Sequence, residues 1–102
     1  MREITKKELE ELTKQNGPIL LDIYGVWCMP CKVLLPKLEK LEKEYTNKVL
    51  FVKMDVQKNM GFAEEMGIKS VPTVLIYKGE ELIEKIFGVA DEQEYKSVLD
   101  TL

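Results

Sequence analysis

The segment at residues 19–24 constrains the fold most, because it is a near-continuous apolar run interrupted only by Asp22. A strand with one face in water alternates apolar and polar residues, whereas an apolar run indicates a strand that is covered on both faces. Such a strand lies in the middle of a sheet that is at least partly parallel. The rest of the chain must therefore supply helices for both faces, and the carboxyl of Asp22 is conspicuous between them.

A helix is predicted before this segment. Thr5 and Glu8 have the spacing of a capping box, in which two side chains satisfy the first free N–H groups of a helix. The helix should begin at Lys6 and be stopped by Gly17-Pro18. Residues 2–4 are a candidate for a short edge strand ahead of it.

A second helix is predicted after the segment from apolar residues that recur at helical spacing. Leu34, Leu38, Leu41 and Tyr45 follow one another at intervals of four, three and four residues, which places them on one face of a helix. This helix should begin at or just before the two cysteines of the chain, and Pro36 should kink it.

The second half of the chain continues to alternate between strands and helices. Strands are predicted at residues 49–54, 71–77 and 82–87, and the last two are close enough to form an antiparallel hairpin. A shorter helix is expected at residues 59–66, where Gly67 stops it.

A closing helix should begin after Asp91, which has with Glu94 the spacing of a second capping box. Parallel strands that are joined through helices need right-handed crossovers, and the helices then cover both faces of the sheet. The whole pattern predicts an α/β sandwich in one domain, residues 1–102.

Composition narrows the classes of partner. The net charge is −3 and Arg2 is the only arginine, so no basic face with guanidinium groups is available to recognise phosphates or bases. No apolar stretch approaches the roughly 20 residues of a membrane span, and residues 1–7 contain no apolar signal region. We therefore expect neither nucleic acid nor a membrane as a partner, and we expect a cytoplasmic location.

The two cysteines, Cys28 and Cys31, are separated by two residues, and the chain has no histidine. Neither a Ser-His-Asp nor a Cys-His nucleophile is therefore possible, and two thiolates do not complete the four ligands of structural zinc. As a structural crosslink the pair would be weak, because closing so short a loop is worth only about 2 kcal/mol. Redox chemistry explains the pair better.

The position of the pair at a helix start indicates different roles for the two sulfurs. Cys28 faces unpaired N–H groups and the positive end of the helix dipole, which favour the thiolate, so it is the expected nucleophile. Cys31 follows one turn later on the same side and further inside, which suits the resolving role.

Several residues around and beyond the pair form a combination that is specific, although any one of them alone would be weak. They are Asp22, Trp27, Pro30, Lys32, Pro36, Lys53, Val71-Pro72-Thr73, Gly79 and Gly88. With this combination the chain resembles the thioredoxin family over nearly its whole length. The resemblance implies the thioredoxin fold, with a mixed central sheet of four or five strands and helices on both faces.

The resemblance also implies a reaction, in which Cys28 attacks a disulfide of another protein and Cys31 then resolves the mixed disulfide. Asp22 would take or relay the proton of Cys31, and its apolar strand neighbours independently indicate a buried carboxyl with a raised pKa. Lys53 is hypothesised to be the charge partner of Asp22. Met29 departs from the glycine that is usual in the family, and the dipeptide between the cysteines tunes the redox potential.

Pro72 resembles the cis-proline of the family, which faces the cysteines and leaves the Val71 backbone free to pair with an extended substrate. A flat apolar docking surface is expected around the reactive sulfur. Its residues are Trp27, Met29, Pro30, Val71, Pro72 and Gly88.

The expected activity is that of a protein disulfide oxidoreductase, a dithiol electron carrier with no bound cofactor and no metal. We expect it to act as a monomer on disulfide-containing proteins and to be recharged by a thioredoxin-reductase-type enzyme. Two alternatives stay open. A glutaredoxin-like protein would be recharged by glutathione, although Trp27 and the order Met29-Pro30 argue against it. A module that binds a metal or bridges an Fe–S cluster across a dimer would use Cys28 and Cys31 as ligands.

Overall fold

The structure is a computed structural model that describes all 102 residues. It contains five strands, four α-helices and one short 3₁₀ helix. In chain order these are β1 (Arg2–Glu3), α1 (Lys6–Thr13), β2 (Pro18–Tyr24), α2 (Met29–Glu44), β3 (Leu50–Asp55), η1 (Val56–Lys58), α3 (Met60–Glu65), β4 (Thr73–Lys78), β5 (Glu81–Phe87) and α4 (Glu92–Leu99).

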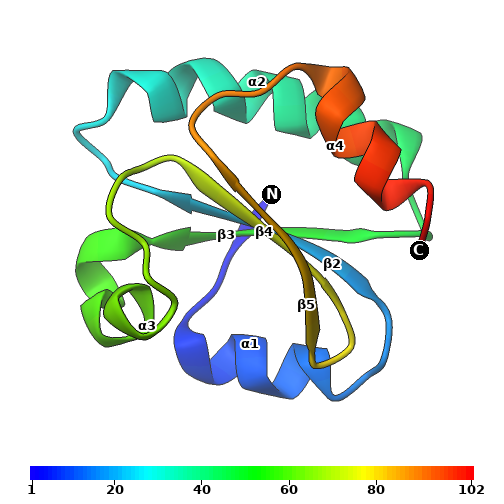
Figure 1. Ribbon diagram of the computed structural model, residues 1–102, viewed down its shortest axis with the longest axis horizontal. Coiled ribbons are helices and arrows are strands. Elements are labelled where there is room, and N and C mark those ends of the chain that lie inside the picture. Colours follow the sequence, from blue (N-terminus) through cyan, green and yellow to red (C-terminus); the bar gives the residue numbers. More distant parts are fainter.

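The five strands form one mixed sheet in the order β1-β3-β2-β4-β5. β1, β3 and β2 are parallel to one another, whereas β4 runs antiparallel to β2 and to β5. Helices α2 and α4 cover one face of the sheet, and α1 and α3 cover the other (Figure 1). The predicted α/β sandwich is confirmed, including the edge strand at the N-terminus and the hairpin of β4 and β5.

Strand β2 is the central strand, and its side chains divide the hydrophobic core into two clusters. Ile19, Leu21 and Ile23 belong to the cluster on the side of α1 and α3, whereas Leu20 belongs to the cluster under α2 and α4. Because side chains alternate along a strand, Asp22 points to the same side as Leu20. The buried carboxyl therefore lies under the helix that follows the cysteine pair.

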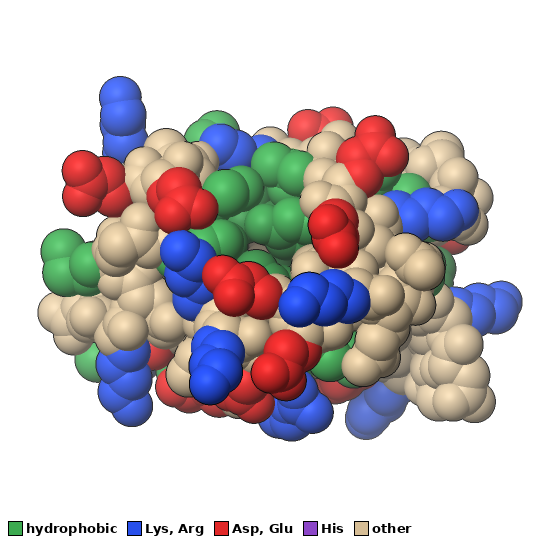
Figure 2. All heavy atoms as spheres, turned by 90° about the horizontal axis from the view of Figure 1, so that it is seen from below, with side chains coloured by type: hydrophobic (Ala, Val, Ile, Leu, Met, Phe, Trp, Pro, Cys, Tyr) green, Lys and Arg blue, Asp and Glu red, His purple; other side chains and the backbone are tan.

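The opposite cluster includes Leu9 of α1 and Phe62 of α3, and the half-buried Leu12, Met66 and Leu82 pack against it. Seen from this side of the molecule, hydrophobic side chains gather near the centre and are surrounded by charged ones (Figure 2).

None of the helices combines the length and the apolarity that crossing a bilayer requires.

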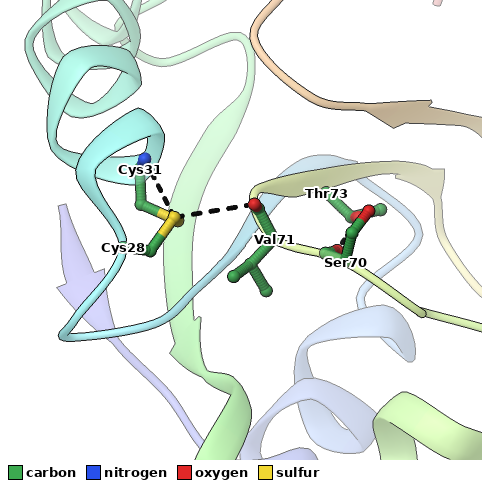
Figure 3. The surroundings of a disulfide bond; sticks show 5 residues. All are labelled: Cys28, Cys31, Ser70, Val71 and Thr73. Atoms are coloured by element: carbon green, nitrogen blue, oxygen red, sulfur yellow. Dashed lines mark hydrogen bonds between the residues drawn. A yellow bond between two sulfur atoms is a disulfide. The ribbon is translucent and has the colours of Figure 1, made fainter.

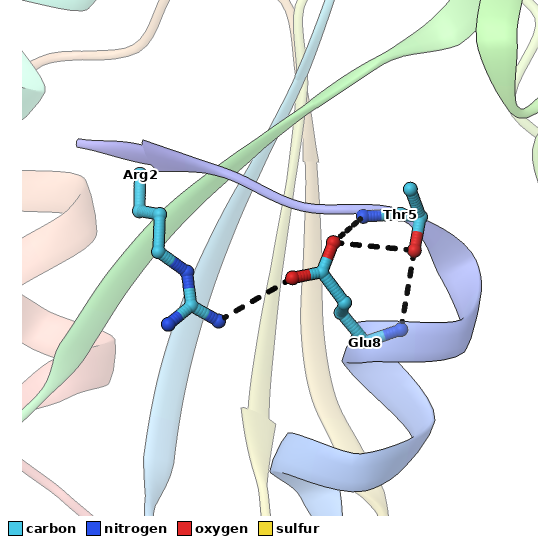
Figure 4. Close-up of polar contacts among 3 residues, drawn as sticks. All are labelled: Arg2, Thr5 and Glu8. Carbon is cyan, nitrogen blue, oxygen red and sulfur yellow. Dashed lines mark hydrogen bonds and ion pairs between the residues drawn. The ribbon is translucent and has the colours of Figure 1, made fainter.

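The N-terminal helix begins where the sequence predicts. The Thr5 hydroxyl accepts the Glu8 N–H at 3.3 Å and the Glu8 carboxylate accepts the Thr5 N–H at 3.0 Å, so the capping box is complete (Figure 4). Arg2 lies 3.9 Å from the same carboxylate. The helix ends at Thr13, before the predicted stop, because Asn16 already takes the left-handed conformation with φ of 64°.

The second predicted capping box is wrong. Asp91 is the N-cap of α4, but its side chain makes no capping hydrogen bond. The Glu94 N–H, which the carboxylate was expected to accept, donates instead to the backbone carbonyl of Asp91 at 3.0 Å. The first turn is thus closed by backbone alone.

The helix predicted at residues 59–66 is shorter than expected and is preceded by η1. Asn59 separates the two helices, since its side chain accepts the Lys6 N–H at 3.1 Å and donates to the Asp55 carbonyl at 2.9 Å. Gly67, with φ of 69°, follows the end of α3 as predicted.

Candidate active site at the start of α2

The two cysteines lie where the connection after β2 enters α2. Cys28 is the N-cap of α2, with an extended backbone conformation (φ −94°, ψ 110°), and Met29 is the first helical residue. Cys28 and Cys31 form a disulfide, and their Cα atoms are 5.3 Å apart (Figure 3). The prediction that the pair lies at a helix N-terminus within bonding reach is confirmed.

The Cys28 sulfur accepts a hydrogen bond from the helix that it caps. The Cys31 N–H donates to Cys28 Sγ at 3.2 Å, and Pro30, in the first turn, has no N–H that competes. An N-cap atom also lies at the positive end of the helix dipole. In the reduced protein the same contact favours negative charge on this sulfur, and hence the thiolate.

The two cysteines differ in their surroundings rather than in exposure. Each is 4 % exposed, so the expected deeper position of Cys31 is not visible as a smaller exposed area. Cys28 Sγ lies 3.5 Å from the Val71 carbonyl oxygen (Figure 3), whereas Cys31 lines a cavity together with Asp22. The Cys28 sulfur thus lies beside the Val71 loop, whereas Cys31 shares a cavity with a buried carboxyl.

Asp22 lies in that cavity, whose volume is ≈ 210 Å³. The residue is 1 % exposed, and its Oδ1 atom has no hydrogen-bond partner. Burial raises the pKa of Asp22 to about 7, while the positive charge of Lys53 acts in the opposite direction. The expected burial and raised pKa are confirmed, and Asp22 and Cys31 line the same cavity.

Lys53 is the neighbour of Asp22 on the adjacent strand, because the parallel register of β2 and β3 pairs the two residues. Both line the cavity, but no ion pair joins them within 4.0 Å. The Lys53 ammonium lies over the Tyr24 ring, 5.5 Å from its centroid, and the Tyr24 hydroxyl donates to Glu3 Oε1 at 2.6 Å. Lys53 therefore acts on Asp22 through space and not by direct contact.

The loop before β4 faces the Cys28 sulfur. The Val71–Pro72 peptide bond is cis, as the sequence predicts. β4 begins after it, at Thr73 and not at residue 71, because proline has no N–H to join the ladder of the sheet. The Gly88 N–H donates to the Pro72 carbonyl at 2.8 Å and ties the loop to the end of β5. Val71 thus lies beside the disulfide, and Pro72 connects it to Gly88.

Exposed apolar side chains flank the disulfide. Trp27 is 61 % exposed and Met29 is 66 % exposed. A Cβ at Gly25 would come within 3.1 Å of the Trp27 ring, so glycine lets the indole lie close to the backbone. Of the other predicted surface residues, Pro30 is exposed, Val71 and Gly88 are half-buried, and Pro72 is buried.

Four residues that sequence reasoning missed also border the site. Val56 and Ile68 line a hollow together with Trp27 and Val71, and no local motif identifies them because they come from distant parts of the chain. Tyr24 lies beneath the Lys53 ammonium, and Glu3 accepts a hydrogen bond from the Tyr24 hydroxyl. The two-residue spacing of Tyr24 from Asp22 on one strand is a usable signal, whereas Glu3 has none without the register of the sheet.

Comparison with known proteins decides the family. The sequence model of the family described as thioredoxin matches residues 1–101. The chain belongs to the thioredoxin family. Among curated thioredoxins, that of Buchnera aphidicola is 35 % identical over 99 residues, which is 96 % of this chain and 92 % of the relative. That of Listeria monocytogenes is 35 % identical over 100 residues, 98 % of this chain and 96 % of the relative.

Solved thioredoxin structures have the same fold. The oxidised mitochondrial thioredoxin 3 of Saccharomyces cerevisiae matches with a TM-score of 0.89 at 34 % identity, and the match covers 100 % of this chain and 95 % of the yeast chain. A mutant thioredoxin of Halobacterium salinarum matches with a TM-score of 0.88 at 30 % identity, and the match covers 98 % of this chain and 88 % of the other. The thioredoxin fold with a mixed sheet, here of five strands, is therefore confirmed.

Membership of the thioredoxin family makes the chain a thiol–disulfide oxidoreductase that acts on disulfides of proteins. Thioredoxins carry out this exchange with a cysteine pair and without a bound cofactor, and their general partners are disulfide-containing proteins and thioredoxin reductase. The redox-active pair of this chain is Cys28 and Cys31. No group of three or more His, Cys, Asp or Glu side chains is placed to hold a metal ion.

Proposed function

We propose that this chain reduces disulfides of other proteins with Cys28 as the attacking sulfur and Cys31 as the resolving sulfur. The observation that carries the proposal is the hydrogen bond from the Cys31 N–H to Cys28 Sγ, which caps α2 at 3.2 Å. A sulfur at a helix N-terminus is stabilised as a thiolate, and the thiolate is the nucleophile in disulfide exchange.

The first half of the reaction joins the chain to its substrate. The Cys28 thiolate attacks one sulfur of the substrate disulfide, so that a Cys28–substrate disulfide forms and the substrate S–S bond breaks. The second substrate sulfur leaves as a thiolate and takes a proton from water. The covalent intermediate is the mixed disulfide that is usual in such exchange.

The second half releases the substrate. Cys31 gives its thiol proton to the Asp22 carboxylate across the cavity that both residues line. The Cys31 thiolate then attacks Cys28 Sγ, the mixed disulfide breaks, and the other substrate sulfur leaves as a thiolate that takes up a proton. Two electrons have passed to the substrate, and the chain holds the Cys28–Cys31 disulfide. A carboxyl with a pKa of about 7 can accept and release this proton near neutral pH.

The substrate would bind over the exposed apolar side chains next to the disulfide. Trp27 and Met29 supply apolar contact area, and Met29 is long and flexible enough to adapt to different partners. The Val71 carbonyl, 3.5 Å from Cys28 Sγ, would accept a backbone N–H of an extended substrate segment. Apolar docking combined with backbone pairing suits unrelated target sequences.

Reuse of the chain requires that the Cys28–Cys31 disulfide be reduced again. We assign this step to a thioredoxin-reductase-type enzyme that docks on the same face, next to the disulfide. The proposal includes action as a monomer in the cytoplasm, where a reducing thiol pool keeps such a pair in its dithiol form.

Trapping tests the roles of the two sulfurs. A Cys31→Ser variant should accumulate mixed disulfides with protein substrates, because Cys28 still attacks and nothing resolves the intermediate. The matched control is Cys28→Ser, which should accumulate none. Non-reducing electrophoresis followed by mass spectrometry of the linked peptides reads both variants. Linkage through Cys31 in the control, with none in the Cys31→Ser variant, would reverse the assignment, and equal linkage in both variants would also contradict it.

The role of Asp22 is tested at the same step. An Asp22→Asn variant keeps the shape of the side chain but cannot accept the Cys31 proton. It should form the mixed disulfide at the wild-type rate and resolve it more slowly at neutral pH, which rapid-quench analysis of a single turnover measures. An unchanged rate of resolution would remove Asp22 from the reaction.

A further inference from the structure

Glu3, Lys53 and Asp22 form a row across three neighbouring strands. The parallel register pairs Glu3 of β1 with Lys53 of β3, and it pairs Lys53 with Asp22 of β2. Paired residues on adjacent strands point to the same face of the sheet, so one ammonium stands between two carboxylates. The register therefore makes both carboxylates candidate ion-pair partners of Lys53.

Neither ion pair forms, since no carboxylate oxygen lies within 4.0 Å of the Lys53 ammonium. Tyr24, two residues after Asp22 on the same strand, makes the two contacts that replace them. Its ring lies 5.5 Å from the ammonium, measured to the ring centroid. Its hydroxyl donates to Glu3 Oε1 at 2.6 Å. The Tyr24 side chain thus holds the Lys53 ammonium over its ring and donates a hydrogen bond to the Glu3 carboxylate.

Both contacts have a known physical effect. A cation over an aromatic ring is attracted by the electron-rich face, more strongly where water is partly excluded. A carboxylate that accepts a short hydroxyl hydrogen bond has part of its charge compensated, so it attracts a nearby ammonium less. Burial and the hydrogen bond to Glu3 raise the pKa of Tyr24, so its hydroxyl stays protonated and remains a donor.

We propose that Tyr24 is a positioning residue that holds the Lys53 charge beside Asp22 by keeping it from pairing with Glu3. The inference rests on the proposed role of Asp22 as the proton acceptor for Cys31. An ammonium in direct contact would keep Asp22 ionised, whereas an ammonium drawn away to Glu3 would leave the carboxyl protonated. With the ammonium held over the Tyr24 ring, the charge lies between these two extremes. The Asp22 carboxyl can then exchange a proton near neutral pH.

The remaining groups around Asp22 are unchanged in every variant described below. Asp22 contributes to raising the pKa of the buried Tyr95, after burial itself. Cys31 does not titrate while it is in the disulfide, so the oxidised protein gives a clean titration of Asp22. The residues of neighbouring helices and strands that face Asp22 or line its cavity are Cys31, Lys32 and Leu35 of α2, Tyr95 of α4 and Val74 of β4.

The test is a Tyr24→Phe variant of the oxidised protein. Phenylalanine keeps the ring but frees the Glu3 carboxylate, which should draw the ammonium away from Asp22. The pKa of Asp22, followed by carbon-13 NMR of its carboxyl, should rise by about half a unit, as expected when a charge about 6 Å away retreats by about 2 Å at an effective dielectric constant of about 20. An unchanged or lowered pKa overturns the proposal.

Two further variants separate a moved cation from a direct effect of the lost hydroxyl. In a Glu3→Gln background the Tyr24→Phe change should leave the pKa of Asp22 equal to that of the Glu3→Gln single variant, because glutamine has no charge with which to attract Lys53. In a Lys53→Met background it should also have no effect, and a rise that persists there overturns the proposal. Since no turnover is involved, these outcomes are independent of the single-turnover test of Asp22.

Discussion

The Asp22→Asn variant should gain stability relative to the unmodified protein as the pH rises from 4 to 8. In the folded protein burial raises the pKa of Asp22 from 3.8 to about 7, whereas the unfolded chain exposes this carboxyl to water. Between these two values the folded state holds a proton that the unfolded state has lost. The contribution of protonated Asp22 to the free energy of unfolding is therefore fully present below pH 4, falls as the pH rises towards 7, and is lost above it.

The magnitude follows from the same pair of values. A difference of about three pKa units corresponds to about 4 kcal/mol, since one unit is about 1.4 kcal/mol. Asp22 is 1 % exposed, so solvent screening does not reduce the effect greatly. Asparagine has no proton to lose, and the variant should keep at pH 8 most of the stability that the unmodified protein loses. Burial of its amide adds a constant term, so the pH dependence of the difference is the quantity to measure.

Urea unfolding of both oxidised proteins at pH 4, 6 and 8 gives this difference. The control is Asp91→Asn, because Asp91 is exposed and its side chain makes no capping hydrogen bond. The control should stay within about 0.5 kcal/mol of the unmodified protein at each pH, as is usual for surface substitutions. A stability gain for Asp22→Asn that is the same at pH 4 and pH 8 would refute the assignment of a proton to the buried carboxyl.

Two other substitutions test the first helix and the docking surface. Thr5→Ala should lower the free energy of unfolding by about 1 kcal/mol, because it removes the hydroxyl that accepts the Glu8 N–H; an unchanged urea midpoint would mean that the capping box does not stabilise α1. Trp27→Ala should raise the KM for a protein disulfide several-fold while leaving the reduction of a small aromatic disulfide reagent unchanged, since only a protein substrate covers the exposed indole. Equal losses with both substrates would argue against a docking role for Trp27.

The parts of the fold that depend on local sequence could be predicted, whereas those that depend on distant partners could not. The run at residues 19–24 is buried as the central strand, and Thr5 caps its helix as the spacing indicates. The spacing of Asp91 and Glu94 is equally good, yet a backbone carbonyl takes the N–H that the carboxylate was expected to accept. Spacing shows that a side chain can reach an N–H donor, but it does not show which of the available acceptors receives the hydrogen bond.

The site divides in the same way. The apolar strand neighbours of Asp22 are enough to predict that its carboxyl is buried. Its relation to Cys31 is implied by the family resemblance, and the structure shows that the two residues line one cavity. The register of three strands decides where the Lys53 ammonium lies, and residues as distant in sequence as Glu3 and Tyr24 contribute to it. No pattern within one segment contains that information.

The two sulfurs of the pair are the same chemical group, so their different roles have to come from their surroundings. Cys28 Sγ accepts an N–H of its own helix, which favours loss of its proton before any substrate arrives. In the proposed mechanism the Cys31 thiol is activated later, by proton transfer to Asp22, which lines the same cavity and can accept a proton near neutral pH. The buried charge that makes this possible destabilises the fold, and such a cost is expected where an active site needs a group out of water. If Asp22→Asn gains stability at pH 8 and also resolves mixed disulfides slowly, both effects trace to one buried ionisable carboxyl.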